Sequence, residues 1–229
     1  MSVRGIAASG LAALLAACAD HPPPPDWQVN AKASLDRAVV AYFAGDARAE
    51  EEETVLARAA MASTGKPALV ARAELVRCAA RTASLVFEPC AGYEAVAVDA
   101  DATERAYARY LVGGVDAGEI AQLPAQHRAA AAARNATEGD AAVASIEDPL
   151  ARLVAASVLL QRGQADANVV ARAVDTASAQ GWRRPLLAWL GVQQRLAQQS
   201  GDADAAARIG RRAALVAASP RSAPASAPP

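Results

Sequence analysis

The sequence predicts an all-α protein in which antiparallel helical hairpins stack as an irregular bundle or short solenoid. Alanine, the best helix former, contributes much of the 53% of residues that are hydrophobic. Apolar residues recur at spacings of three and four between glycines, prolines and capping acids, and runs of β-branched residues are few. Aromatic residues make up only 4% of the chain, so small and aliphatic side chains must form most of the core.

The first part of the domain is predicted to hold three helices. Residues 35–43 place their apolar side chains on one face, and Gly45 ends that helix. Asp46 is positioned to cap a second helix, whose early turns carry the acidic run 50–53 as a solvated face at the positive end of the helix dipole. A third helix runs from about 67 to 84. The inner face of the second helix is predicted to consist of Val55, Leu56, Ala59 and Ala60.

The middle of the chain is less regular. Residues 85–99 are the least helical stretch, and residues 85–87 are expected to form a buried extended turn. Asp101 and Glu104 have the spacing of a capping box at the start of the next helix. A short alanine-rich helix is expected after Pro124.

The last third gives the clearest helical pattern. Asp148, Asp166 and Asp202 each stand before an apolar-periodic stretch as N-caps, and Pro185 opens a further helix between the last two of them. The helix after Asp166 is predicted to turn Val169, Val170, Ala173, Val174 and Ala177 inward.

The first eighteen residues form a pattern of their own. One basic residue, Arg4, precedes an apolar run from 5 to 17 that is too short to span a bilayer, and Leu15-Ala16-Ala17 stands directly before Cys18. This resembles a bacterial lipoprotein signal peptide that ends in a lipobox. The resemblance implies that residues 1–17 are removed and that Cys18 carries the lipid, whereas a plain secretory signal is the alternative.

The same resemblance suggests a location. In such lipoproteins an aspartate directly after the lipidated cysteine tends to retain the protein in the inner membrane, and here that residue is Ala19. The resemblance therefore implies an outer-membrane protein that faces the periplasm. We expect a proline-rich tether over 18–29, one helical domain over 30–217, and a disordered Ser/Ala/Pro tail over 218–229.

Three junctions between predicted helices look alike. Gly45-Asp46-Ala47, Gly163-Gln164-Ala165 and Gly201-Asp202-Ala203 each place glycine at the turn and alanine after it. Such helix pairs resemble tetratricopeptide-type repeats over residues 148–217 and, in part, over 30–63. A generic antiparallel stack of helices predicts the same pattern and stays open.

The remaining cysteines form an even pair. With Cys18 assigned to lipid, Cys78 and Cys90 enclose a short loop in a compartment that permits disulfides. We predict a Cys78–Cys90 disulfide, and two buried free thiols are the alternative. A metal site is disfavoured because no histidine lies near them in sequence.

Catalytic patterns are missing from the sequence. A net charge of -1 without a basic patch argues against nucleic acid. There is no phosphate-binding glycine loop, no His-Glu-x-x-His and no Cys-x-x-Cys. Of the two histidines, His21 lies in the tether and His127 is expected at the surface or as a cap. We therefore expect no catalytic residues, no metal and no cofactor.

One stretch combines residues that binding surfaces favour. Trp182, Arg183 and Arg184 stand together before a predicted helix that also contains Trp189. Tryptophan and arginine are enriched at interface hot spots, so these three residues are candidates for binding a partner. The competing interpretation places Trp189 in the core and packs Trp182 over a helix end.

These observations predict a lipid-anchored envelope protein whose helical domain acts as an adaptor or scaffold and has no catalytic activity. Its partners would be the membrane, through Cys18, and an unidentified envelope protein or peptide. One alternative is an enzyme or accessory subunit acting on cell-wall material with acids such as Glu88, Glu94 or Glu119. A purely structural envelope lipoprotein is another.

Overall fold

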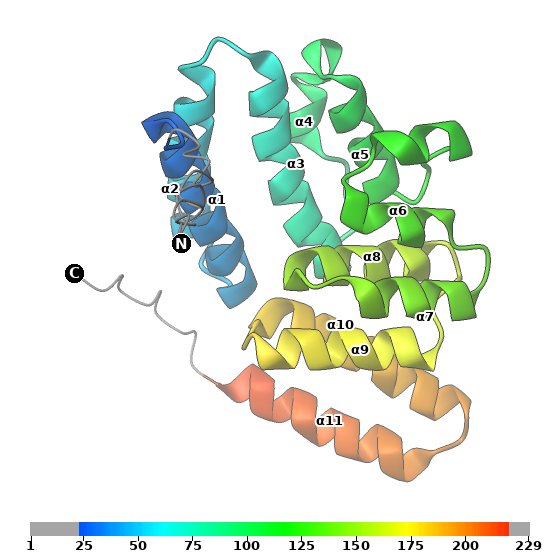
Figure 1. Cartoon of the computed structure of the whole chain (residues 1–229). Coiled ribbons are helices and arrows are strands. Elements are labelled where there is room, and N and C mark those ends of the chain that lie inside the picture. Colours follow the sequence, from blue (N-terminus) through cyan, green and yellow to red (C-terminus); the bar gives the residue numbers. More distant parts are fainter. Residues whose placement is uncertain (1–22, 220–229) are drawn as a thin grey trace, which may run out of the picture.

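The computed structural model describes residues 23–219, which form helices and their connections without a strand, and so confirms the predicted all-α class (Figure 1). The predicted signal peptide, Cys18 and nearly all of the predicted tail lie outside the described residues. No helix within 23–219 is long and apolar enough to cross a membrane. The helices are α1 (Asp26–Ala44), α2 (Ala47–Ala62), α3 (Pro67–Ala83), α4 (Ala91–Glu94), η1 (Ala97–Asp99), α5 (Ala102–Leu111), η2 (Ala117–Gln122), α6 (Ala125–Ala132), α7 (Ala136–Ser145), α8 (Pro149–Gln161), α9 (Ala167–Ala179), α10 (Arg183–Gln199) and α11 (Ala203–Ala218).

Helix α3 is the centre of this arrangement. The hairpin of α1 and α2 packs on it, and α5 and α8 pack on it as well (Figure 1). From α8 onward each long helix packs on the next, down to α11. The stack also closes on itself, because α10 contacts both α9 and α1. One large apolar cluster runs through the molecule from α1 to α11.

The predicted N-caps form as expected. The carboxylates of Asp46, Asp148, Asp166 and Asp202 each accept a hydrogen bond from a backbone N–H in the first turn of α2, α8, α9 and α11 respectively. The inward face predicted for α9 is buried throughout. Helix α10 begins two residues before Pro185, at Arg183, and α1 begins at Asp26, so the last four residues of the predicted tether are helical.

The face assigned to α2 is wrong. Val55 and Leu56 are exposed, whereas the buried positions are Glu50, Thr54, Ala57 and Met61. The expectation that apolar residues face inward fails here because Glu50 is buried against two arginines of α3, Arg77 and Arg81. The acidic run is therefore not a uniformly solvated helix start.

The structure differs from the prediction at three further places in the middle of the chain. Asp101 makes no side-chain capping bond to α5, and Glu104 is buried against Arg72 instead of returning to the cap. Phe87 is exposed, not part of a buried turn. Helix α7, capped by Asn135, was not predicted at all, because its glycine and its short length weaken the periodic pattern.

Long-range polar contacts join the helices. The indole N–H of the buried Trp189 donates to the carbonyl of Ala83 at 3.1 Å and so fixes α10 to the end of α3. Arg58 on α2 reaches the buried Glu74 on α3 at 2.6 Å. Arg72 on α3 reaches the buried Glu104 on α5 at 2.8 Å. Each contact fixes the position of one helix along its neighbour.

Cys78 and Cys90 lie together in the structure. Their sulfur atoms are bonded, and their Cα atoms are 5.9 Å apart, within the usual range for a disulfide. Cys78 belongs to α3, and Cys90 precedes α4. The bond therefore ties the irregular segment after α3 back to that helix.

We predict that Cys78 and Cys90 are joined in protein isolated under non-reducing conditions. Replacing both with serine should lower the free energy of unfolding by about 3 kcal/mol, because the unfolded chain loses its short closed loop. Peptide mass analysis without reductant detects the bond, and urea unfolding measures the loss. Two free thiols in protein from an oxidising compartment would contradict this prediction.

A side chain at Gly92 should destabilise the protein. A Cβ built there would overlap the Glu74 carboxylate, whose carboxyl carbon would lie only 2.5 Å away. Because Glu74 is buried and bound to Arg58, it cannot move freely. Gly92→Ala should cost about 1–3 kcal/mol of unfolding free energy, measured by urea denaturation.

Gly118 provides the matched control, since a Cβ there meets nothing within 4 Å. Gly118→Ala should change stability by less than about 0.5 kcal/mol. Equal losses in the two variants would show that the contact with Glu74 is not the cause.

Candidate functional site

Tyr42, near the end of α1, is the centre of a cluster of arginines. The guanidinium carbon of Arg184, on α10, lies 4.1 Å from the centroid of the Tyr42 ring. That of Arg81, on α3, lies 4.9 Å from the same centroid. Both cations are attracted by the electron-rich face of the ring. Three helices that are distant in sequence therefore meet at one aromatic side chain.

Glu50 balances part of this positive charge. Its buried carboxylate accepts hydrogen bonds from Arg77 at 3.1 Å and from Arg81 at 2.9 Å, and Arg77 also donates to Glu51 at 2.8 Å. Burial by itself lowers the pKa of Arg77, but the hydrogen bond to Glu50 and the charges of Glu50, Glu51 and Glu74 together outweigh it and raise the pKa above its usual value. The hydroxyl of Thr54 donates to the Glu50 carbonyl at 2.7 Å.

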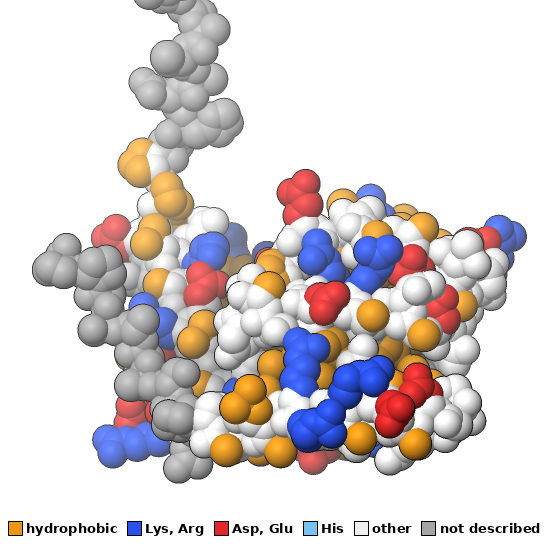
Figure 2. Space-filling model, turned by 90° about the horizontal axis from the view of Figure 1, so that it is seen from below, with side chains coloured by type: hydrophobic (Ala, Val, Ile, Leu, Met, Phe, Trp, Pro, Cys, Tyr) orange, Lys and Arg blue, Asp and Glu red, His pale blue; other side chains and the backbone are white. Residues whose placement is uncertain are grey.

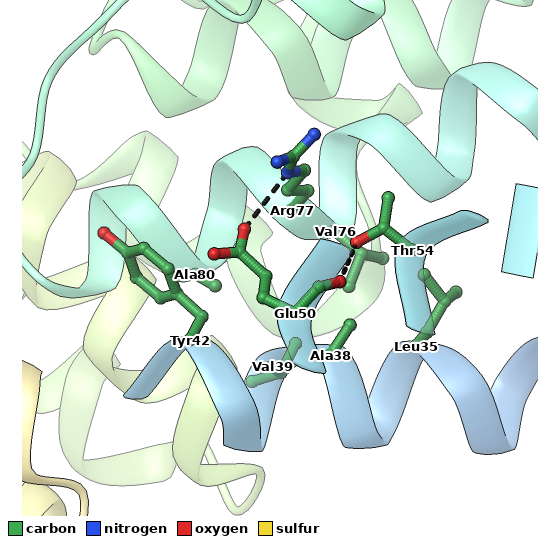
Figure 3. A pocket seen from close by; sticks show the side chains of 9 residues that line it. All are labelled: Leu35, Ala38, Val39, Tyr42, Glu50, Thr54, Val76, Arg77 and Ala80. Atoms are coloured by element: carbon green, nitrogen blue, oxygen red, sulfur yellow. Dashed lines mark hydrogen bonds and ion pairs between the residues drawn. The ribbon is translucent and has the colours of Figure 1, made fainter. Parts of the chain in front are cut away.

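A small hollow lies beside these residues, between α1, α2 and α3 (Figure 3). Its volume is about 240 Å³, including the solvent at its mouth. Figure 3 shows Glu50 and Arg77 joined above a floor of small apolar side chains from α1. The hollow is lined by Leu35, Ala38, Val39, Tyr42, Glu50, Thr54, Val76, Arg77 and Ala80.

A second hollow of about 390 Å³ is lined in part by Arg81. The disulfide and the ends of α3, α5 and α8 form its walls. Two large apolar side chains on its lining face solvent, Phe87 with 49% and Val112 with 65% of their surface exposed. Glu88 and Gln161 add polar groups to the lining. We call this the disulfide hollow.

The three residues predicted to bind a partner have contacts inside the domain. The Trp182 ring packs on Phe43, with the centroids 4.6 Å apart. Arg183 donates to the carbonyls of Val216 and Ala217 at the end of α11. Arg184 lies over Tyr42. Trp182 and Arg183 thus join helices, and only Arg184 belongs to the arginine cluster around Tyr42.

Sequence reasoning missed two residues of the disulfide hollow, Phe87 and Arg81. Arg81 also donates a hydrogen bond to Glu50, which lines the first hollow. Arg77 and Arg81 stand four residues apart on α3, and this spacing could have indicated a face that pairs with the acidic run on α2. No local pattern indicates the contact with Tyr42, because it joins residues on different helices.

The acids weighed for catalysis are divided among separate elements. Glu119, on η2, binds Arg109, and this hydrogen bond lowers the pKa of Glu119. Glu88 lines the disulfide hollow, and Glu94 is exposed on α4. Within residues 23–219, no three histidine, cysteine, aspartate or glutamate side chains gather as metal ligands would.

His127 is buried, against the expectation of a surface residue or cap. Its ring lies beside those of Tyr110 and Tyr107, with centroid distances of 5.0 and 5.4 Å respectively. Burial lowers the pKa of His127 to about 4, although the charge of Asp148 acts in the opposite direction. Neither Nδ1 of His127 nor the hydroxyl of Tyr110 has a hydrogen-bond partner among the described residues. Neutral His127 is therefore a core side chain.

Comparisons with known proteins do not identify this chain. No protein-family model matches it, and neither a curated protein nor a solved structure shows significant similarity.

We predict that His127 makes the fold sensitive to acid. The unfolded chain binds a proton near pH 6.5 but the folded chain only near pH 4, so stability is complete above about pH 6.5 and declines as the pH falls toward 4. The loss across this window should be about 3 kcal/mol. Urea unfolding between pH 7 and 4 measures it.

His127→Phe keeps an aromatic ring at the position and removes the titrating group. The difference in unfolding free energy between the wild type and this variant should therefore vary with pH in this window. The carboxylates titrate in both proteins, so their contribution cancels in the difference. An identical pH dependence in the two proteins would refute the role of His127.

Proposed function

We propose that this protein is a lipid-anchored adaptor of the bacterial envelope, without catalytic activity, whose helical domain binds a protein or peptide partner at the disulfide hollow. The lipobox-like sequence before Cys18 supports the anchor and an outer-membrane location facing the periplasm. The single observation that carries the binding role is the exposure of Phe87 and Val112 beside Arg81.

This combination suits a protein partner. Exposed aromatic and aliphatic side chains supply apolar area for a contact, and arginine is enriched at interface hot spots. Arg81 is held in place by Glu50 and by the Tyr42 ring, so it loses little freedom on binding. Glu88 and Gln161 offer polar groups for orienting a peptide backbone.

The surroundings of the hollow are rigid. The disulfide forms part of its wall, and α3, beneath it, packs against α1, α2, α5 and α8. A preorganised surface lowers the entropic cost of association. These features favour recognition of a partner by a fixed surface over closure around a substrate.

The anchor is tested by replacing the lipidated cysteine. Cys18→Ser should move the protein from the membrane fraction to the soluble fraction, because the acyl chains provide the membrane affinity. Fractionation of cells followed by immunoblotting makes the comparison. A Cys18→Ser variant that stays with the membranes would sink the lipid-anchor proposal.

The binding surface is tested separately. In-cell cross-linking and affinity purification of the tagged, anchored protein should recover one reproducible envelope partner. Phe87→Asp should reduce that recovery about tenfold or more, because it introduces a charge into the centre of an apolar contact. Purified partner and protein would then be compared by calorimetry.

Leu56→Asp is the matched control, since Leu56 is similarly exposed but lies on α2, which contributes no residue to the lining of the disulfide hollow. Its recovery of the partner should equal that of the wild type. If Phe87→Asp recovers as much partner as the wild type, the disulfide hollow is not the binding site. If the wild type recovers no reproducible partner, the adaptor role is refuted.

A further inference from the structure

Helix α11 carries a basic stripe of exposed residues. Arg208, Arg211, Arg212 and Leu215 follow one another at spacings that place them on one side of the helix, and all are exposed. On the other side Ile209, Ala213 and Val216 pack on the core. Figure 2 shows basic side chains gathering over this end of the molecule.

Among the described residues, the arginines of this stripe form no ion pair with an acid. The ion pairs within residues 23–219 include none of the three. Arg212 donates to the Ser178 hydroxyl at 3.0 Å, which leaves its charge uncompensated. Asp204, one turn before Arg208, is the one acid of α11 against these three arginines. The stripe therefore presents excess positive charge to solvent.

A second surface has the opposite charge. Glu94 at the end of α4, Asp99 in η1 and Asp101 before α5 are exposed, and none forms an ion pair within the described part of the chain. The nearest base in sequence, Arg105, donates to the carbonyl of Ala100. We call residues 94–101 the acidic segment.

Each surface also exposes a large apolar side chain. Val98, within the acidic segment, is 89% exposed, and Leu215, on the stripe, is 74% exposed. These are the highest exposed fractions of the large hydrophobic residues in the described chain. A contact that covers both would remove apolar surface from water and bring opposite charges together.

One copy of the protein cannot make this contact with itself. The acidic segment lies by α4 at the top of Figure 1, whereas α11 lies at the bottom, with the stack of helices between them. We propose that the basic stripe of one copy docks on the acidic segment of a second copy, head to tail. Such a contact is heterologous, so it grows into short chains unless its rotation closes a ring.

The proposal stands independently of the adaptor role, because neither surface includes Phe87, Val112 or Arg81. It predicts an association driven by charge and therefore sensitive to salt, since screening within about 10 Å at 0.1 M salt weakens contacts between exposed groups.

The test uses the full chain purified in a nonionic detergent. Sedimentation velocity should show a mass that rises with protein concentration at low salt and falls back toward the monomer at high salt. The variant R208E/R211E/R212E, and separately the variant E94K/D99K/D101K, should each weaken self-association about tenfold or more, because each brings like charges together. Helical circular dichroism and thermal melting check that both variants fold.

Mixing the two variants gives the decisive measurement. In each variant alone, the stripe and the acidic segment carry charge of the same sign, so copies repel one another. In an equimolar mixture, the acidic stripe of R208E/R211E/R212E can meet the basic segment of E94K/D99K/D101K, so association should return. Arg48→Glu, on the exposed side of α2, should associate like the wild type.

Three results would overturn the proposal. A wild type that stays monomeric at low salt and high concentration rules the contact out. A mixture that stays monomeric shows that the two surfaces do not meet. A monomeric wild type that binds phosphatidylglycerol vesicles, and loses this binding in R208E/R211E/R212E, assigns the stripe to a lipid surface instead.

Discussion

Buried glutamates paired with arginines across helix α3 are the interaction on which the rest of the structure depends. Glu50, Glu74 and Glu104 are all buried, and each is bound to an arginine of another helix. Helix α3 supplies one partner to every pair, so α2 and α5 are placed relative to it by charge as well as by packing. Because a buried carboxylate left alone costs about 3–5 kcal/mol, the helices cannot slide without a large penalty. This constraint gives a unique arrangement to helices whose small side chains would otherwise permit several.

The alanine-rich core explains why such a constraint is needed. Alanines let helices approach closely but offer few large knobs that would fix one helix along another. The few large core residues therefore fix one helix against another. Trp189 of α10, for example, donates its indole N–H to the Ala83 carbonyl at the end of α3. The closure of the stack, with α10 against α1, depends on two such contacts, Phe43 with Trp182 and Tyr42 with Arg184.

Local chemistry could be predicted from the sequence, and contacts between distant residues could not. The capping aspartates identified the starts of α2, α8, α9 and α11 because a cap involves only neighbouring residues. The inward face of α2 was misassigned because the burial of Glu50 depends on arginines about thirty residues away. For the site, tryptophan and arginine composition pointed to Trp182, whereas the exposed side chain proved to be Phe87. Composition identifies residue types that suit an interface but not which of them the fold leaves uncovered.

The pairing of charges in the first half of the molecule gives meaning to the charges left unpaired elsewhere. In α2, all four glutamates from 50 to 53 form ion pairs with arginines. Glu51 and Glu52 are exposed, and Glu53 pairs with Arg37 of the hairpin partner α1. In this helix, acids are paired with arginines even where water could solvate them. Among the described residues, the three arginines of the stripe on α11 and the three acids of the acidic segment lack such ion pairs, and they lie at two opposite ends of one domain. Their opposite sign and the exposed side chains of Val98 and Leu215 beside them make the two surfaces complementary, and none of the six charged side chains belongs to the core.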